Sequence, residues 1–122
     1  MVVFGGYDGS NKNDVWTFNL TSYNWTELTT SATKPGVRQS HSSIFYEGQM
    51  VMFGGNHGSN KNDVWTLNLN SYNWTERTTS TTKPSARWGH SSILYNGQMV
   101  MFGGDDESDR FNDVWILNLI SY

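Results

Sequence analysis

The sequence contains no cysteine, only two prolines and no long apolar segment. Without cysteine the chain can form no disulfide, bind no metal through a thiolate and use no cysteine as a nucleophile. Its first residues, MVVFGG, have neither the basic start nor the apolar stretch of a signal peptide. No segment approaches the roughly 20 apolar residues that cross a bilayer as a helix. We therefore expect no membrane partner, and the compartment stays open.

An excess of basic residues is also missing. Eight lysines and arginines stand against eleven acidic residues, and the formal net charge is -3 at pH 7. Proteins that neutralise nucleic-acid phosphates usually carry clustered positive charge, so we expect no nucleic-acid partner. What the chain does have is aromatic side chains, at 15% of 122 residues. So many aromatics in a small polar chain suggest one domain in which large side chains wedge between repeated units.

Internal repetition is the strongest pattern in the sequence. The strings VVFGGYDGSNKNDVW, VMFGGNHGSNKNDVW and VMFGGDDESDRFNDVW begin at residues 2, 51 and 100, so the period is 49 residues. Residues 1–49 and 50–98 differ at only 13 positions, which indicates recent duplication of one module. The third copy carries one extra residue in the loop before Asp113. The chain is therefore an array of similar units.

Each unit has the pattern of short strands. Large and polar side chains alternate with a period of two in DVWTFNL and DVWTLNL, and runs such as QMVMFGG are rich in residues that suit a pleated sheet. Gly-containing turns separate some of these runs. No segment keeps a helical apolar stripe for about ten residues. The sequence predicts four strands per repeat, placed in the second copy at residues 41–46, 49–55, 63–69 and 73–77.

Four strands in a repeat of about 50 residues describe one blade of a β-propeller. The motifs FGG, DVW and NW recur in register and resemble the signature of the kelch-repeat β-propeller family over the whole chain. The resemblance implies an all-β fold of four-stranded antiparallel blades, about two and a half of them. With strands a to d counted from the propeller axis, residues 1–40 would form strands b to d, residues 41–89 a complete blade, and residues 90–122 strands a to c.

This arrangement is a partial propeller. Closed propellers have at least about four blades, so we expect the chain to be part of a longer kelch protein. Both ends would expose unpaired strand edges, and we expect the isolated chain to self-associate through them. Either the remaining blades of a parent chain or a second copy would then complete the structure.

The repeated glycines, tryptophans and aspartates have structural interpretations. A strand that turns sharply where blades crowd together needs backbone that is free of Cβ clashes and able to adopt positive φ, which explains the glycine pairs. Tryptophans would fill the space between neighbouring sheets. Asp14, Asp63 and Asp113 are expected to accept backbone N–H bonds at the turn into the third strand. His41 and His90 recur identically, which favours buried structural histidines over metal ligands.

Strand alternation places two sets of loops on the upper face of the expected propeller, called the loop face below. They are the b–c loops, residues 7–13, 56–62 and 105–112, and the d–a loops, residues 29–40 and 78–89. Seven of the 13 differences between the first two copies fall in these loops. Simple tolerance of loops to change explains this, and so does a binding surface whose units have diverged. Both interpretations stay open.

Several residues of the loop face are candidates for partner binding. They are Tyr7, Arg38, His57, Arg87, Trp88, Asp105 and Asp106. Arginines at the end of the d–a loop commonly point toward the mouth of the channel in kelch propellers. The resemblance therefore implies that Arg38 and Arg87 grip acidic groups of a partner. The alternative is that each arginine bonds carbonyls or an aspartate of a neighbouring blade.

Catalysis and cofactor binding find little support. Galactose oxidase has similar blades, but its copper chemistry depends on a tyrosine cross-linked to a cysteine, which this chain lacks. Kelch proteins that direct glucosinolate breakdown carry an iron site of spaced Glu, Asp and His, and no such pattern occurs. The acidic run of residues 105–109 could bind a hard cation, but it lacks the glycine and terminal Glu of an EF-hand loop, which favours a solvated loop. We expect no enzyme activity, no metal and no other cofactor.

The sequence therefore predicts a non-catalytic protein–protein interaction scaffold or adaptor. The alternative is a propeller that binds a carbohydrate or small ligand through Trp88, Tyr7 and the loop asparagines, alone or as the accessory domain of an enzyme. In the first case, Arg87→Ala and Trp88→Ala are expected to weaken partner binding without unfolding the chain.

Overall fold

The computed structural model describes residues 1–122 as an all-β chain of ten strands in three antiparallel sheets. The strands are β1 (Val2–Tyr7), β2 (Asn11–Phe18), β3 (Trp25–Glu27), β4 (Ser42–Tyr46), β5 (Gln49–Phe53), β6 (Val64–Asn68), β7 (Trp74–Arg77), β8 (Ser91–Tyr95), β9 (Gln98–Asp105) and β10 (Arg110–Asn118). The chain forms no helix, and so no helical segment that could cross a membrane. The expectation of an all-β fold is confirmed.

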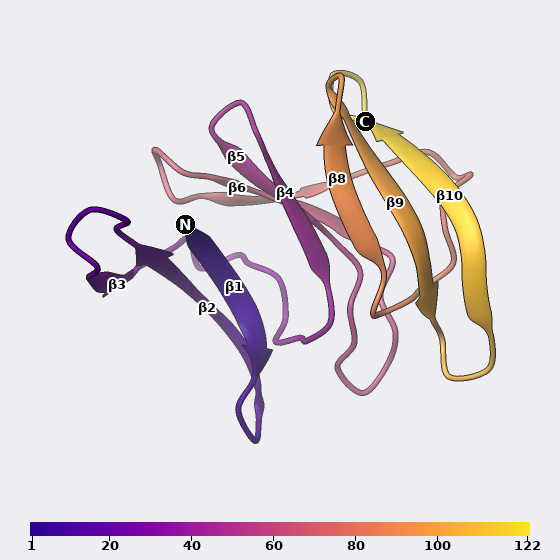
Figure 1. Cartoon of the computed structure of the whole chain (residues 1–122), viewed down its shortest axis with the longest axis horizontal. Coiled ribbons are helices and arrows are strands. Elements are labelled where there is room, and N and C mark those ends of the chain that lie inside the picture. The colour runs from indigo at the N-terminus through magenta and orange to yellow at the C-terminus, as the bar shows by residue number, and fades with distance from the viewer.

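Strands that follow one another in the chain are hydrogen-bonded neighbours, in the orders β1-β2-β3, β4-β5-β6-β7 and β8-β9-β10, numbered sheets 1 to 3. Figure 1 shows the sheets as a fan, with sheet 1 at one end and sheet 3 at the other. The edge strands β4 and β8 lie next to each other. Sheet 2 has four strands, whereas sheet 1 has no counterpart of β4 and sheet 3 has none of β7. Such sheets agree with the blades of a partial propeller.

Tight turns join the first two strands of sheets 2 and 3. Glu47 and Gly48, between β4 and β5, have φ angles of 44° and 77°. Asn96 and Gly97, between β8 and β9, have φ angles of 47° and 71°. Two consecutive residues with positive φ characterise the two-residue turn whose twist matches that of the flanking strands. The turn sets the register of the hairpin and with it the face that each side chain reaches.

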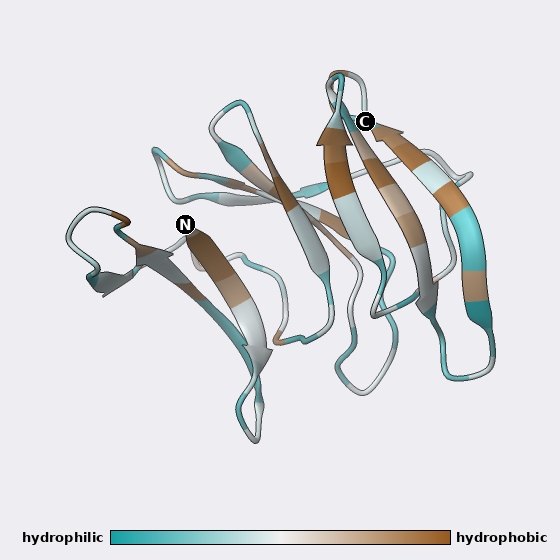
Figure 2. Cartoon of the chain, viewed as in Figure 1, coloured by the Kyte–Doolittle hydropathy of each residue, from teal (hydrophilic) through white to brown (hydrophobic).

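Two hydrophobic cores lie between the sheets. The core between sheets 1 and 2 contains Phe4, Val15, Met50, Met52, Trp65, Leu67 and Trp74. The core between sheets 2 and 3 contains Ile44, Val51, Phe53, Val64, Met99, Met101 and Leu119. Because successive side chains of a strand point to opposite faces, sheet 2 contributes one set of residues to each core. Figure 2 shows apolar bands along β8, β9 and β10 of sheet 3.

Two tryptophans fill the space between sheets 1 and 2. Trp74 lies edge-on to Phe4, with ring centroids 4.9 Å apart. Trp65 lies edge-on to Trp74 at 6.4 Å. Offset and edge-to-face ring pairs of this kind add to the stabilisation from burial. The predicted role of tryptophan between neighbouring sheets is confirmed at these two positions.

The glycine pairs allow close backbone contact. Gly54 and Gly55 have φ angles of +66° and +95°. A Cβ atom on Gly54 would lie 2.8 Å from the carbonyl oxygen of Arg87, and one on Gly55 would lie 2.7 Å from that of Gln39. Both distances are too short for any side chain, and the backbone angles disfavour one as well. The predicted reason for the glycine pairs is therefore confirmed.

The b–c loops of sheets 1 and 3 are shorter than expected. Strand pairing continues past the glycine pair, so that Tyr7 pairs with Asn11 and Arg110 with Asp105. A register shift near the glycines accommodates the extra length, as a β-bulge does. In sheet 2 the strand β5 ends at Phe53, and residues 54–63 form the longer connection. The loop boundaries predicted for sheets 1 and 3 are corrected accordingly.

Candidate functional site

Arg38 joins sheet 1 to sheet 2. Its backbone N–H donates to Lys12 O, and its carbonyl accepts from Gly6 N, both at 2.9 Å and both in sheet 1. Its guanidinium reaches sheet 2, where Nη1 and Nη2 donate to the two carboxylate oxygens of Asp63 at 2.7 and 2.8 Å. Nη1 also donates to Gly54 O at 2.9 Å. The residue therefore bridges two sheets, with its backbone on one and its side chain on the other.

Arg87 repeats this arrangement one period later. Its backbone bonds sheet 2, and its guanidinium donates to Asp113 of sheet 3 at 2.6 and 3.0 Å. Nη1 also donates to Gly103 O at 3.0 Å, and the guanidinium carbon lies 4.0 Å from the centre of the Phe111 ring. Only 1% of Arg87 and 3% of Arg38 is exposed.

Both arginines are thus committed within the chain. The guanidinium groups face the neighbouring sheet and have no free N–H fork to offer a partner's carboxylates. The contacts favour the alternative, in which Arg38 and Arg87 bond a carbonyl and an aspartate of the next blade, over the expectation that they grip acidic groups of a partner. The sequence contained a hint of these pairs, because each arginine precedes a repeat that carries the recurring aspartate of the Asp-Val-Trp motif.

The aspartates accept hydrogen bonds mainly from side chains. Trp65 Nε1 donates to Asp63 at 2.8 Å, and Trp115 Nε1 donates to Asp113 at 2.7 Å, in addition to the arginines. Burial by itself raises the pKa of Asp63, but the bonds from its arginine and tryptophan outweigh burial and hold the pKa below its usual value. The arginine also holds the pKa of Asp113 low. Side chains are thus the main donors to these aspartates, in addition to the predicted backbone N–H.

Hydrogen bonds join the loops of the loop face to one another. Gln39 and Asn56 exchange backbone N–H···O bonds at 3.1 and 2.9 Å, and Trp88 and Asp105 do so at 3.0 and 2.9 Å. Each pair connects a d–a loop to the b–c loop of the next sheet. The ends of the b–c loops point the same way, along the lower edge of Figure 1. The loop face is therefore a continuous strip.

Two side-chain contacts bridge neighbouring b–c loops. The Asn11 amide nitrogen lies 2.9 Å from His57 Nδ1, which links sheet 1 to sheet 2. Asn60 Nδ2 donates to Asp106 O at 2.9 Å and links sheet 2 to sheet 3. Asparagines at equivalent positions of the first two copies thus play the same role, which sequence reasoning did not identify. These bonds restrain the loops that carry the candidate residues.

The remaining candidates fall into two groups on the loop face. Tyr7 pairs with Asn11, whose side chain contacts His57, so Tyr7 and His57 belong to one group, and both are exposed. Trp88, Asp105 and Asp106 form the second group and are half-buried. The structure brings members together within each group, while the two arginines lie in the interior.

The acidic loop of sheet 3 uses its carboxylates locally. Asp105 Oδ1 accepts the backbone N–H of Glu107 at 2.6 Å. Asp106 Oδ1 accepts those of Ser108 and Asp109 at 3.0 and 2.7 Å. Aspartates commonly stabilise turns in this way. No group of three or more His, Asp or Glu side chains gathers anywhere in the structure where it could hold a metal ion.

His90 is a structural residue. It is buried, and its Nε2 lies 3.2 Å from Phe53 O. Burial lowers its pKa to about 4. His41 occupies the equivalent place near Phe4, and burial together with the charge of Arg38 lowers its pKa to about 4 as well. The prediction of a buried, hydrogen-bonded histidine is confirmed for His90.

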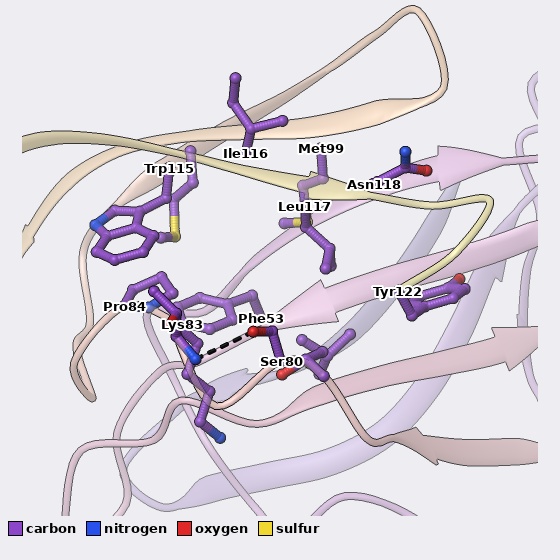
Figure 3. Close-up of a pocket in the computed structure, with 14 residues that line it drawn as sticks. Phe53, Ser80, Lys83, Pro84, Met99, Trp115, Ile116, Leu117, Asn118 and Tyr122 are labelled. Atoms are coloured by element: carbon purple, nitrogen blue, oxygen red, sulfur yellow. Dashed lines mark hydrogen bonds between the residues drawn. The ribbon is translucent and has the colours of Figure 1, made fainter.

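An apolar pocket opens between sheet 3 and the d–a loop that precedes it. Figure 3 shows Met99, Leu117 and Trp115 on one side, and Ser80 and the neighbouring loop residues on the other. At the equivalent junction of sheets 1 and 2, the backbone N–H of buried Trp74 donates to Ser31 Oγ. The pocket therefore lies where sheet 3 has no fourth strand, and it contains no grouping of catalytic side chains.

A comparison with known families agrees with this architecture. A family model described as the KLHDC2/KLHL20/DRC7 Kelch-repeats domain matches residues 1–122. No curated protein matches the sequence significantly. The family match covers the whole chain, and three antiparallel sheets with recurring glycine pairs and inter-sheet tryptophans are what blades of this type require. The chain belongs to the kelch-repeat family.

Proposed function

We propose that this chain is a non-catalytic protein–protein interaction scaffold or adaptor that binds its partner through the loop face. Kelch-repeat domains are in general protein-interaction modules. Rigid sheets that carry exposed, variable loops suit this role, because the loops can change while the cores stay intact. The arginines, aspartates, glycine pairs and tryptophans that join the sheets are shared by the first two copies, whereas seven of the 13 differences between these copies fall in the loops of the loop face.

The observation that carries the proposal is that the backbone of the loop face is held by hydrogen bonds while the side chains at the same positions vary between copies. Backbone hydrogen bonds hold the loops in place at Gln39 and Asn56 and again at Trp88 and Asp105. Side chains at these fixed positions vary between copies, as Gln39 and Trp88 do. A restrained backbone lowers the entropy cost of binding, and variable side chains supply specificity.

The chemistry of the partner follows from the side chains that remain accessible. Burial of both arginines removes the reason to expect a partner with acidic groups. The accessible residues of the loop face include aromatic Tyr7 and His57 and carboxylates of the acidic loop. Aromatic residues surrounded by a polar rim are typical anchors of protein interfaces. We therefore propose a protein partner that contacts the aromatic group and complements the acidic loop.

The test exchanges loop residues between copies. In the variant Tyr7→Asn/Asp8→His, the first loop receives the residues that the second copy has at positions 56 and 57. The control Tyr23→Asn changes an exposed tyrosine in the turn between β2 and β3, and Asn tolerates the positive φ of that position. Both variants should melt like the wild type. Affinity capture with quantitative mass spectrometry should lose partner with the loop variant and keep it with the control.

Equal capture by all three proteins would count against the loop face. Loss of capture with Tyr23→Asn alone would place the binding surface on the opposite edge of the sheets.

A second candidate function is carbohydrate binding, as a propeller domain alone or as the accessory domain of an enzyme. Half-buried Trp88 lies beside Asp105, and Asn60 reaches the same loop, so an aromatic residue and polar groups are neighbours there. Trp88→Gln installs the residue that the first copy has at position 39. Saturable binding on a glycan array that this variant abolishes would favour the carbohydrate function over the protein scaffold.

A further inference from the structure

Both ends of the fan expose an apolar sheet face. The face of sheet 1 that points away from sheet 2, called the leading face, consists of Met1, Val3, Trp16, Phe18 and Trp25. The face of sheet 3 that points away from sheet 2, called the trailing face, consists of Ile93, Val100, Phe102, Val114 and Ile116. The leading face is bordered by one acidic residue, Glu27, which lies opposite Trp16 on the same side of sheet 1. Contiguous exposed apolar patches of this kind usually mark interaction sites.

The two faces match surfaces that already pack together inside the chain. The counterparts of the leading face in sheet 2 are Met50, Met52, Trp65, Leu67 and Trp74, all buried against sheet 1. Those of the trailing face, residues 44, 51, 53, 64 and 66, are buried on the other side of sheet 2. Each exposed face therefore repeats one half of a junction that the structure shows closed.

One pair of aromatic residues shows the match most clearly. Trp74 and Phe4 contact each other across the first junction, and their exposed fractions are 5% and 4%. Their counterparts, Trp25 on the leading face and Phe102 on the trailing face, are 51% and 54% exposed. Each half of this aromatic contact is thus exposed, the tryptophan on the leading face and the phenylalanine on the trailing face.

We propose that a second copy of this chain docks its leading face on the trailing face, with Trp25 of one copy against Phe102 of the other. The contact is a sheet-to-sheet junction of the kind seen within the chain and differs from pairing of open strand edges. The interface is heterologous, because each copy uses a different face. The proposal is independent of the loop face and of the function proposed for it.

A junction between copies would be weaker than one within the chain. Within the chain, an arginine from the connecting loop holds Asp63 or Asp113, whereas Asp14 of sheet 1 bonds only its tryptophan. A junction between copies has no connecting loop and so no such arginine. Reversible, concentration-dependent association is the expected behaviour.

Complementary variants test the proposal. Trp25→Asp blocks the leading face, and Phe102→Asp blocks the trailing face, because each places a charge in an apolar contact. Both positions are exposed in the monomer, so folding should be preserved, which a thermal melt checks. Tyr7→Asp is the control, since Tyr7 is exposed and lies on the loop face. Light scattering after size exclusion measures the mass of each protein and of the equimolar mixture.

The wild type and Tyr7→Asp should exceed the monomer mass of 13.9 kDa increasingly with concentration. Each face variant alone should remain a monomer. The mixture should form a dimer of twice that mass and nothing larger, because each variant retains the face that the other has lost. A monomeric wild type, association of either single face variant like the wild type, or a mixture that stays monomeric would each overturn the proposal.

Discussion

Arg38 and Arg87 illustrate how one residue connects two repeats. Each holds its own sheet through the backbone and the next sheet through a bidentate pair with an aspartate. A buried guanidinium that loses its partner, or a carboxylate that loses its guanidinium, leaves an uncompensated charge. The contacts of these side chains therefore support a role in stability.

Arg87→Ala is accordingly expected to destabilise the fold. Loss of one member of a fully buried ion pair typically costs about 3–5 kcal/mol. Because Asp113 is 37% exposed, solvent screens part of this loss, and we expect the free energy of unfolding to fall by somewhat less than that. Arg110→Ala is the control, because Arg110 is 93% exposed and its pair with Asp105 is long, at 3.5 Å. An exposed pair contributes at most about 1 kcal/mol. Urea unfolding curves of the two variants compare them, and equal midpoints would rule out the inter-sheet role of Arg87.

Half-buried His41 and buried His90 predict how stability depends on pH. Their pKa is about 4 in the folded chain, below the ordinary value of 6.5. Between these values the unfolded chain takes up protons that the folded chain does not, so the free energy of unfolding falls as pH falls from 6.5 to 4. Urea midpoints at pH 7, 6 and 5 should decline, and His90→Gln should flatten the decline. A midpoint that stays constant over this range would contradict the burial of these histidines.

At the scale of the element, identical sequences have different surroundings. Strands β3 and β7 both begin with Trp-Thr-Glu, yet Trp74 is buried against sheet 1, whereas Trp25 faces away from the other sheets. The tryptophan stabilises the molecule only where a neighbouring sheet covers it. The value of a motif in one repeat thus depends on the position of that repeat in the chain.

Trp74→Ala and Trp25→Ala measure this difference. Removal of a buried Trp costs about 3–5 kcal/mol, whereas an exposed one should change the stability of the monomer by less than about 1 kcal/mol. Thermal melts at low protein concentration, where association is negligible, make the comparison. Similar losses of stability for both variants would mean that Trp25 is buried in the monomer, which would contradict the structure.

A comparison of Gly54 with Gly58 distinguishes the cost of backbone strain from the cost of a steric clash. Gly54 and Gly58 have nearly the same φ, +66° and +65°, but a Cβ would meet the Arg87 carbonyl only at Gly54. Gly58→Ala should cost about 1–2 kcal/mol for the left-handed backbone. Gly54→Ala should cost a further ~1–3 kcal/mol because the contact must open. Equal melting temperatures would show that β5 does not pack closely on the following loop.

Much of this architecture could be predicted from the period and the alternation. The 49-residue spacing located the strands, and the period of two identified which side chains are buried. The direction of the arginine side chains could not be read in the same way, because it depends on how a loop of one repeat meets the next sheet. The bulges that lengthen β1 and β9 past the glycines were missed for a similar reason, since local pairing there overrides the turn that glycine permits.

At the scale of the molecule, one kind of junction recurs. Sheets 1 and 2 and sheets 2 and 3 are joined by an apolar core, an arginine–aspartate pair and a glycine contact. The cores and the arginine–aspartate pairs fix the sheets relative to each other. Hydrogen bonds between neighbouring loops hold the backbone of the loop face in place as well. The exposed side chains of the loop face are what such a scaffold leaves free for a partner.

Hydrogen–deuterium exchange, measured on the free chain and on its complex with the captured partner, tests this account most directly. The account predicts that binding slows exchange in the b–c loops, residues 8–10, 54–63 and 106–109, in the strand residues that flank them, and in the ends of the d–a loops near residues 39 and 88. Exchange in the turns at the opposite edge, residues 47–48, 69–73 and 96–97, should stay unchanged. Protection confined to those turns, with no change in the b–c loops, would contradict a partner-binding loop face.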